Sequence, residues 1–422
     1  MSPRSVFAER DFRLLLAGQT ASQLGSQVSS VALPLLAVIT LGASSFEVGL
    51  INAAATVAFA VIGLPAGAWL DRRTRRPVLV AADLVRAALL ATIPAAAALG
   101  RLSILQLIMV ALLVGAARVF FDIGYRSYLP TVTGRDRVLA GNSVLEFVRA
   151  SGQVTGPGLG GLLVALIGGA GVLALQAGTF ALSAITLLAI RTREVRPAQA
   201  PRRRGEIREG LHYVWRQPLL RATAAASALG NLSFAIASAV STIFLARTLG
   251  LSPALIGLII ASGSATVLAG AALTPRLARR WGSVRLSWLS LAVTAPLSIV
   301  GVLAQPGWST MLVIIGIAAG ELGQIVYAIT SLSLRQRTCP DHLLGRVNAT
   351  MTVLIMGLFP LGALAGGALG DLIGPRATLL VAGVLLSLAP ILLYAGLRGV
   401  PEPDEAGPAD LDDRPEPEAD PR

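Results

Sequence analysis

Long apolar runs alternate with short polar gaps along almost the whole 422-residue chain. The runs are continuous and rich in Leu and Ala, which favours membrane helices over the alternating pattern of a β-barrel. About twelve of them reach roughly 18 residues, enough to cross a bilayer as an α-helix. The pattern therefore predicts an all-α membrane protein. The predicted spans lie near residues 13–40, 47–70, 77–99, 103–127, 139–166, 170–190, 221–246, 254–275, 285–304, 309–333, 348–370 and 377–397.

The longest polar gap divides these spans into two sets of six. Two equal sets are typical of transporters built from internal repeats. A short echo supports a repeat, because GAWLDRRTRR after the second span resembles GAALTPRLARR after the eighth, with Gly67 aligned to Gly270 and Asp71 replaced by Thr274. We predict an N-terminal six-helix bundle over residues 1–190, a cytoplasmic linker over 191–220, a C-terminal bundle over 221–399 and a tail over 400–422.

Two segments outside the spans have distinct compositions. In the linker, REGLHYVWRQPLLR is predicted to form an amphipathic interfacial helix with Leu211, Val214 and Trp215 on one side. The tail PEPDEAGPADLDDRPEPEADPR is acidic and rich in proline, so it is predicted to be disordered.

Arginine is concentrated in the even-numbered gaps between spans. The second gap contains Arg72, Arg73, Arg75 and Arg76, and the sixth contains RTREVRPAQAPRRRGEIREG. The odd-numbered gaps, such as TLGASSFE, GGAG and TLGLSP, contain few arginines. Because positive charge marks the cytoplasmic side, this asymmetry predicts a multi-pass protein of the cell (inner) membrane with both termini in the cytoplasm.

Composition agrees with a lipid environment and argues against several functions. The chain is 54% hydrophobic and 14% charged, with a mean hydropathy of +0.71 and a formal net charge of +12. The arginines lie in short gaps without interleaved aromatic residues, which argues against a nucleic-acid partner, and no lysine is present for a phosphate-binding P-loop. One cysteine, Cys339, and two loop histidines, His212 and His342, provide neither a disulfide nor a metal cluster. We expect no catalytic residues, no metal and no cofactor.

The second gap has the pattern Gly67-x-x-x-Asp71-Arg72-x-x-Arg75-Arg76. A glycine allows helices to approach closely, and an acid at a helix end can bind the N-terminus of a neighbouring helix or an arginine. Such a contact can hold one conformation of a moving protein. The pattern therefore predicts a gating loop as well as a topology signal.

The fifth span contains a second pattern, formed by Gly152, Gly156, Pro157, Gly160 and Gly161. Proline removes a backbone hydrogen bond, and glycines allow tight packing and bending. The pattern predicts a helix that can bend against a partner helix. A generic glycine packing face is the simpler alternative.

Both patterns resemble motifs of the major facilitator superfamily, the first its signature loop and the second its antiporter motif. SLSLRQRTCPDHLLGRVNAT, REGLHYVWRQPLLR and the start FAERDFRLLLAGQTASQLGSQVSSVALPLL are similar to the branch that holds the enterobactin exporter and macrolide efflux proteins. The resemblance implies two pseudo-symmetric six-helix bundles, a loop in which Asp71 and Arg75 stabilise the outward-facing state, and export rather than uptake. The chain departs from the family at one point, because Arg118 is followed four residues later by Asp122 instead of glycine, so a proton role does not carry over directly to Arg118.

Ionisable side chains inside the spans are candidates for proton coupling, because a charge at this depth is costly and is retained for function. Glu321 lies about twelve residues into the tenth span, near the expected midplane. A low-dielectric environment favours the neutral acid, so Glu321 is predicted to carry a proton that it loses on contact with water. An acid hydrogen-bonded between helices is the structural alternative.

Three further acids lie three or four residues from an arginine on the same predicted helix. We predict that most of them form ion pairs between helices that form and break during gating. The arginines concerned are Arg118, Arg86 and Arg149. The full set of proton-coupling candidates is Glu321, Arg118, Asp122, Asp83 and Glu146.

Polar side chains also recur inside the spans. Three glutamines repeat every four residues in the first span, and an asparagine occupies a comparable place in the seventh. Lipid offers these amides no partner, so they are predicted to line a polar cavity, with hydrogen bonding between helices as the alternative. The candidate substrate-binding residues are Gln19, Gln23, Gln27, Asn231, Gln324 and Tyr327.

The sequence therefore predicts a secondary transporter that exports a small organic compound, drug-like, macrolide-like or siderophore-like, in exchange for protons by alternating access. Its expected partners are this compound, protons and the lipid bilayer, and a monomer suffices. Two alternatives stay open. One is an importer of a small nutrient with the same fold, and the other is a membrane sensor that transports nothing.

Overall fold

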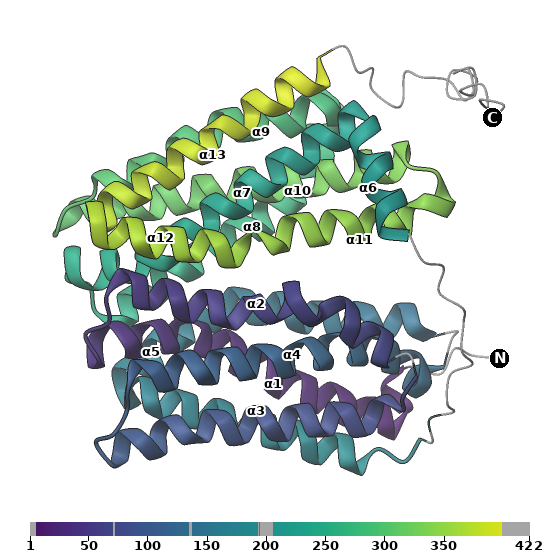
Figure 1. Ribbon diagram of the computed structural model, residues 1–422, viewed down its shortest axis with the longest axis vertical. Coiled ribbons are helices and arrows are strands. Elements are labelled where there is room, and N and C mark those ends of the chain that lie inside the picture. The colour runs from purple at the N-terminus through teal and green to yellow at the C-terminus, as the bar shows by residue number, and fades with distance from the viewer. Residues whose placement is uncertain (1–5, 71, 135–136, 193, 195–205, 399–422) are drawn as a thin grey trace.

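The computed structural model places the helices in two bundles, one above the other in Figure 1, with α1 beginning and α13 ending on the same side. It describes residues 6–70, 72–134, 137–192, 194 and 206–398. Asp71, most of the predicted linker and the acidic tail lie outside these ranges. The N-terminal bundle contains η1 (Val6–Ala8), α1 (Arg10–Leu35), η2 (Leu36–Thr40), α2 (Ser45–Leu70), α3 (Arg75–Ala98), α4 (Ile104–Thr133) and α5 (Val138–Ala189).

The C-terminal bundle follows a short helix, α6 (Glu206–Arg216), in the predicted linker. Of the three apolar side chains expected to share one side of α6, Val214 is buried against the C-terminal bundle, whereas Leu211 and Trp215 are exposed. The bundle contains α7 (Pro218–Ile243), η4 (Phe244–Thr248), α8 (Pro253–Trp281), α9 (Ser283–Ser298), η5 (Ile299–Leu303), η6 (Trp308–Thr310), α10 (Met311–Thr338), α11 (Asp341–Gly357), α12 (Phe359–Ile373) and α13 (Pro375–Leu397).

Helix α5 consists of two spans joined by a tight turn. Gly168 has φ 73° and ψ 162°, a conformation open to glycine and costly for residues with a β-carbon. Gly160, before this turn, and Thr179, after it, contact α1 close together, at Val28 and Gly25. The part of the chain that the structure describes has eleven helices long and apolar enough to cross a membrane, and α5 counted as two segments brings them to the twelve predicted spans. The predicted all-α membrane fold is confirmed.

The two bundles repeat a local structure at the end of their first spans. η2 and η4 are both five-residue π-helical turns. The tripeptides that close them, Thr40-Leu41-Gly42 and Thr248-Leu249-Gly250, are identical, and both glycines have φ 67°. The internal repeat, predicted from a different fragment, is therefore also present in the backbone.

The two ends of the molecule differ in how the bundles meet. We call the end where α1 begins and α13 ends the terminal end, and the end that carries Gly42, Gly168 and Gly250 the closed end. Towards the terminal end each bundle has its own apolar core, one with Phe12 at its centre and one with Leu220. Towards the closed end two clusters combine residues of both bundles, one that joins Ile243 of α7 to the N-terminal bundle and one with residues from α1, α5, η4, α8 and α10. The bundles are therefore joined mainly at the closed end.

Candidate functional site

The antiporter-like pattern lies in the seam, the contact surface between the two bundles. Gly156 and Gly160 pack on α1, whereas Gly161 faces α8 across the seam. A β-carbon at Gly161 would lie 2.3 Å from the carbonyl oxygen of Pro253 and 2.8 Å from Cα of Gly257. Only residues without a side chain allow the two backbones to approach this closely.

Two other positions of the same pattern have looser or different roles. Gly152 is in ordinary contact with α1, with Gln27 and Leu24 3.5 Å from the site of a β-carbon. The backbone of α5 is helical at Pro157, and its break lies at Gly168. A bend at the proline stays a prediction, because a helix can bend at proline while its backbone angles remain helical.

An acid joins the bundles at the closed end. Asp371, near the end of α12, accepts hydrogen bonds from the backbone N–H groups of Ser45 (2.8 Å) and Phe46 (3.3 Å) and from the hydroxyl of Ser44 (2.9 Å). These three donors form the N-terminus of α2, which carries a partial positive charge. The carboxylate thus binds a helix end of the other bundle.

Two further hydrogen bonds cross the seam on the same side. The amide of Asn52 in α2 donates to the carbonyl oxygen of Ser238 in α7 (3.3 Å), and the guanidinium of Arg247 in η4 donates to the carbonyl oxygen of Val38 in η2 (2.8 Å). All inter-bundle hydrogen bonds for which both partners are described residues lie in this half of the molecule. The closed end is therefore held by polar contacts as well as by packing.

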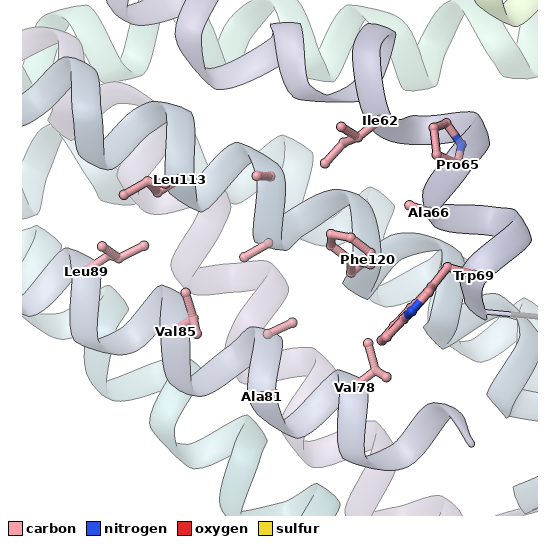
Figure 2. Close-up of a pocket in the computed structure, with 13 residues that line it drawn as sticks. Ile62, Pro65, Ala66, Trp69, Val78, Ala81, Val85, Leu89, Leu113 and Phe120 are labelled. Carbon is pink, nitrogen blue, oxygen red and sulfur yellow. The ribbon is translucent and has the colours of Figure 1, made fainter. Parts of the chain in front are cut away.

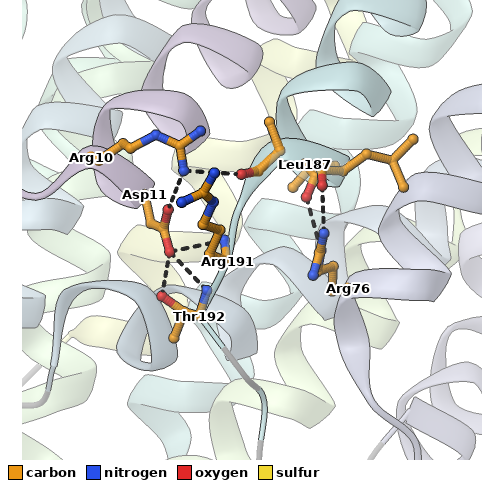
Figure 3. A network of polar contacts seen from close by, with 8 residues as sticks. Arg10, Asp11, Arg76, Leu187, Arg191 and Thr192 are labelled. Atoms are coloured by element: carbon orange, nitrogen blue, oxygen red, sulfur yellow. Dashed lines mark hydrogen bonds and ion pairs between the residues drawn. The ribbon is translucent and has the colours of Figure 1, made fainter.

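Two arginines of the predicted gating loop, Arg75 and Arg76, bind the end of α5 and Glu194, which follows it. Glu194 accepts hydrogen bonds from the backbone N–H of Arg75 (2.6 Å) and of Arg76 (3.2 Å) and from the Arg75 guanidinium (3.1 Å). The Arg76 guanidinium donates to the carbonyl oxygens of Leu187 (2.9 Å) and Leu188 (2.6 Å) in the last turn of α5, as Figure 3 shows. Glu194 thus takes the position at the α3 N-terminus where an acid is stabilised.

The other members of the loop are less constrained in this conformation. Arg72 and Arg73 are exposed, and the Arg73 guanidinium lies over the Trp69 ring at 5.5 Å. At Gly67 a β-carbon would meet no atom within 4 Å. Asp71 itself is outside the described residues.

The end of α5 is fixed from a second side by α1. Asp11 accepts hydrogen bonds from the backbone N–H of Thr192 (2.8 Å) and of Arg191 (3.1 Å) and from the Thr192 hydroxyl (2.6 Å), while Arg10 donates to the carbonyl oxygen of Ala189 (3.3 Å) (Figure 3). These hydrogen bonds at the terminal end therefore join α1 to the end of α5 and do not involve the C-terminal bundle.

The three acid–arginine pairs lie within single helices, which corrects the prediction of ion pairs between helices. Their spacing of three or four residues brings the two groups together on one helix face. Asp83 and Arg86 form a hydrogen-bonded pair that is buried between α3, α4 and α5. The Arg86 guanidinium lies 4.2 Å from the ring centroids of Phe121 and Phe180. Asp83 is enclosed by protein in this conformation.

The side chains of the other two pairs are exposed on the protein surface. Arg118 and Asp122 of α4 approach to 3.3 Å with 71% and 41% of their side chains exposed, and Arg149 and Glu146 of α5 approach to 2.7 Å with 47% and 62% exposed. Arg118 lies about 21 Å along α4 at 1.5 Å per residue, near the middle of the helix. Charges at this depth face water-filled space rather than lipid.

Glu321 lies on α10 against α8. Its Cγ is 3.3 Å from the site of a β-carbon at Gly263. The side chain is half-buried, and none of the described residues forms a hydrogen bond or ion pair with it. Its carboxyl group thus differs from that of Asp83, which is paired with Arg86.

The glutamines of α1 differ in burial. Gln19 is 2% exposed, and its Nε2 has no hydrogen-bond partner among the described residues. Gln23 and Gln27 are half-buried, and Gln27 packs on Gly156 of the antiporter-like pattern. Gln27 thus connects the polar stripe of α1 to the antiporter-like pattern of α5.

Three candidate residues of the C-terminal bundle meet where α7 contacts α10. The hydroxyl of Tyr327 donates to the carbonyl oxygen of Thr223 (2.7 Å) and bonds the hydroxyl of Ser227 (2.8 Å). Gln324 lies against Gly230, one residue before Asn231. Tyr327 is buried and ties two helices together, so its contacts match the hydrogen-bonding alternative.

A pocket of about 640 Å³ lies elsewhere, between α2, α3 and α4. Figure 2 shows that apolar side chains line it, among them Ile62, Trp69, Val85, Leu113 and Phe120. Its thirteen lining residues include none of the predicted substrate-binding or proton-coupling candidates. At about 100° per residue, Arg118 lies about 140° around α4 from Leu113, so it faces away from this pocket.

Sequence reasoning missed four residues that join elements: Asp371, Arg247, Glu194 and Asn52. Each has a partner more than 100 positions away in the chain. The signal for Asp371 was an acid directly after a run of mostly small residues, AGGALGD, in a gap whose other charged residue is Arg376.

The sequence profile of the Major Facilitator Superfamily matches residues 15–360. The chain is 30% identical over 394 residues to the multidrug efflux pump Tap of Mycolicibacterium fortuitum, covering 90% of this chain and 93% of that protein. It is 30% identical over 301 residues to the enterobactin exporter EntS of Citrobacter koseri, covering 67% and 68%.

A solved structure of a bacterial homologue of the iron transporter ferroportin, in its inward-facing state, has a TM-score of 0.76 at 17% identity and covers 92% of this chain and 99% of that chain. The outward-facing structure of such a homologue has a TM-score of 0.57. The helix arrangement is thus that of the inward-facing structure more than of the outward-facing one.

Proposed function

The chain belongs to the Major Facilitator Superfamily, and from this premise we propose that it is a proton-coupled exporter of small organic compounds. Like the relatives that it matches, it is a multi-pass membrane transporter and not an enzyme. Export is supported by the names of two relatives, a multidrug efflux pump and an enterobactin exporter, and by the antiporter-like pattern in the seam. The proposed cargo is drug-like or siderophore-like.

We assign the terminal end to the cytoplasm. The arginine-rich gaps lie there, among them the gap with Arg72 and Arg73, and positive loops stay on the cytoplasmic side. On this assignment the closed end is external, and the described conformation is inward-facing and able to take its cargo from the cytoplasm. The four-part division of the chain at residues 190, 220 and 399, and the monomeric state, belong to the same proposal.

One observation carries the transport mechanism: among the described residues, the bundles are joined mainly at the closed end. A seam held at the closed end, and separate cores at the other, allow the bundles to rock about a central site. The exposed pair of Arg118 and Asp122 at mid-depth supports a water-filled space between the bundles in this state.

We propose Glu321 as the proton carrier. It is the one candidate acid in the described part of the chain that is half-buried at depth without a charged or hydrogen-bonded partner. A proton from the outside would neutralise it when the external side is open, and release to the cytoplasm would follow when the inner side opens. Asp122 and Glu146 are weaker candidates for the proton carrier, because each is paired with an arginine. Asp83 is the weakest candidate, because its pair with Arg86 is buried.

The experiment is ethidium transport in inside-out vesicles with an imposed pH gradient. Wild-type vesicles are expected to accumulate the dye, and Glu321→Gln is expected to reduce gradient-driven accumulation by about 100-fold while dye exchange without a gradient persists. Glu47→Gln, an acid at the closed end, is the matched control and keeps gradient-driven transport.

Each contrary outcome has a definite meaning. Undiminished accumulation by Glu321→Gln refutes its coupling role. Movement of dye only in the opposite direction supports the importer, and a wild-type protein that moves no probe from a panel of drugs and siderophores supports the sensor.

A further inference from the structure

The gating loop has a counterpart at the opposite end of the molecule. Gly67-Ala68-x-x-Asp71 is followed five residues after the acid by Arg76. Gly367-Ala368-x-x-Asp371 is followed at the same distance by Arg376. The first copy lies at the end of α2 and the second at the end of α12, and these two helices cross the molecule in opposite directions.

The arginines of the two copies make the same kind of contact. Arg76 is the second residue of α3 and donates to carbonyl oxygens in the last turn of α5. Arg376 is the second residue of α13 and donates to the carbonyl oxygen of Ala304 (2.6 Å), which follows η5 at the end of the α9 span. In each copy the arginine ties the start of one helix to the end of a neighbour. The likeness in sequence is therefore also a likeness in structure, as expected for inverted repeats.

The acid of the second copy, Asp371, is stabilised by the start of α2 rather than by its own helix. Asp371 lies two residues before the end of its own helix, where the partial negative charge of the helix disfavours an acid. It is placed instead at the N-terminus of α2, where three donors meet it. The residues beside it permit this approach, because a β-carbon at Gly367 would lie 2.8 Å from the carbonyl oxygen of Ser45.

We propose that Asp371 is a second acidic latch, which stabilises the conformation closed at this end and opposes the latch predicted at Asp71. The proposal rests on the transport function proposed above. α2 then takes part in both latches: its N-terminus receives Asp371 in the inward-facing state, and its C-terminal end supplies Asp71 in the outward-facing state. Since rocking closes one end as it opens the other, the two acids act with opposite sign on a single equilibrium.

The test measures whether each acid favours the closed or the open state of the closed end. Spin labels at Leu99→Cys and Trp308→Cys, both exposed at the closed end on opposite bundles, report its opening in a Cys339→Ser background. Asp371→Asn is expected to shift the ratio of closed to open distances by about three- to tenfold towards open, because an exposed charge at a helix end has a modest effect. Asp71→Asn is expected to shift it the other way, and the double variant to return near the wild-type ratio.

Glu47→Gln is the matched control. Glu47 is an acid at the same end of α2, but its carboxylate accepts the N–H of Ser44 in its own bundle (2.8 Å). It is expected to leave the ratio within twofold. A wild-type distribution for Asp371→Asn, or an equal shift for Glu47→Gln, refutes the latch. Asp371→Glu keeps the charge and checks folding: it is expected to retain most of the closed population, and a loss as large as that of the asparagine variant also refutes the proposal.

Transport separates this proposal from the function on which it rests. Dye transport by the wild type with no effect of Asp371 on the distances rejects the latch alone. A protein that moves no probe, yet shifts its distances as expected, rejects the exporter and keeps the latch.

Discussion

The two ends of α2 show how differently one helix can be held in a single conformation. At Gly49, near its start, a β-carbon would lie 2.4 Å from the carbonyl oxygen of Ala363 and 3.0 Å from Cα of Gly367 in the other bundle. At Gly67, near its end, a β-carbon would meet nothing within 4 Å. Both glycines resemble packing residues in the sequence, but only one of them packs here.

If Gly67 belongs to a gating loop, as proposed, we expect it to pack in a conformation other than the one described. A glycine in open space costs helix stability, about 1 kcal/mol relative to alanine, without a return in packing. Gly49 and Gly67 are thus expected to act in different states, and substitutions at the two ends separate these states.

The largest effect is expected where α5 meets α8 in the seam, at Gly161→Ala. Its methyl group would overlap the backbone of α8, and overpacking of this kind costs about 1–3 kcal/mol. We expect the closed-end labels to move apart in most molecules and dye transport to fall by more than tenfold. Gly158→Ala, which would place a β-carbon 3.5 Å from Ala261, is the control and is expected to behave as wild type.

The next effect compares the two ends directly. Gly49→Ala is expected to open the closed end, by about 1–2 kcal/mol, since its methyl group would overlap backbone atoms of α12. Gly67→Ala is expected to leave the described conformation intact and to favour it, because the close approach predicted in the other state is lost. Distance measurements on the two variants should shift in opposite directions, and equal shifts would remove the distinction between the ends.

A smaller effect is expected at Arg247. Arg247→Gln loses the hydrogen bond to Val38 across the seam, worth about 1 kcal/mol, and should open the closed end by about fivefold in population. Arg376→Gln loses a bond of similar length inside one bundle and should lower the melting temperature without changing the label distances. If both variants changed the distances alike, polar contacts across the seam would have no special role.

The smallest effect is expected at the terminal end. Glu194→Gln removes the charge at the N-terminus of α3 and the pair with Arg75, a change of about 0.5–1 kcal/mol. Because these contacts stay within one bundle, detergent-solubilised protein should melt a few degrees lower with an unchanged distance distribution. A clear change in distances would show that the loop already influences the seam in this state.

The sequence was sufficient for the spans and their grouping, because the length and apolarity of a membrane helix are local properties. The turn at Gly168 was predicted as a gap between two spans, and the amphipathic helix α6 was also predicted. The glycine pattern around Gly161 indicated close packing correctly. It did not identify the partner, since Gly257 belongs to another bundle.

The contacts that close one end could not be predicted, because they join residues far apart in the chain and belong to one of several states. In the sequence Asp371 is an acid in a predicted gap, and Glu194 is one charge among many in a polar segment; their contacts with α2 and α3 are visible in the structure alone. The pairs of Asp122 and Glu146 were misassigned for a related reason. Their helical spacing already predicted a partner on the same helix, and that simpler partner is the one observed.

The matched turns Thr40-Leu41-Gly42 and Thr248-Leu249-Gly250 have a consequence for how the chain could have arisen. If an ancestral half paired with an identical copy of itself, the same residue would occur in both turns at the closed end. Here Ile39 aligns with Arg247 of the other turn. Arg247 donates a hydrogen bond to the opposite turn, which the apolar side chain of Ile39 cannot do. The two matched turns are thus asymmetric in this chain. Two identical C-terminal halves joined in tandem would place two guanidinium groups at the closed end, where these turns now supply one.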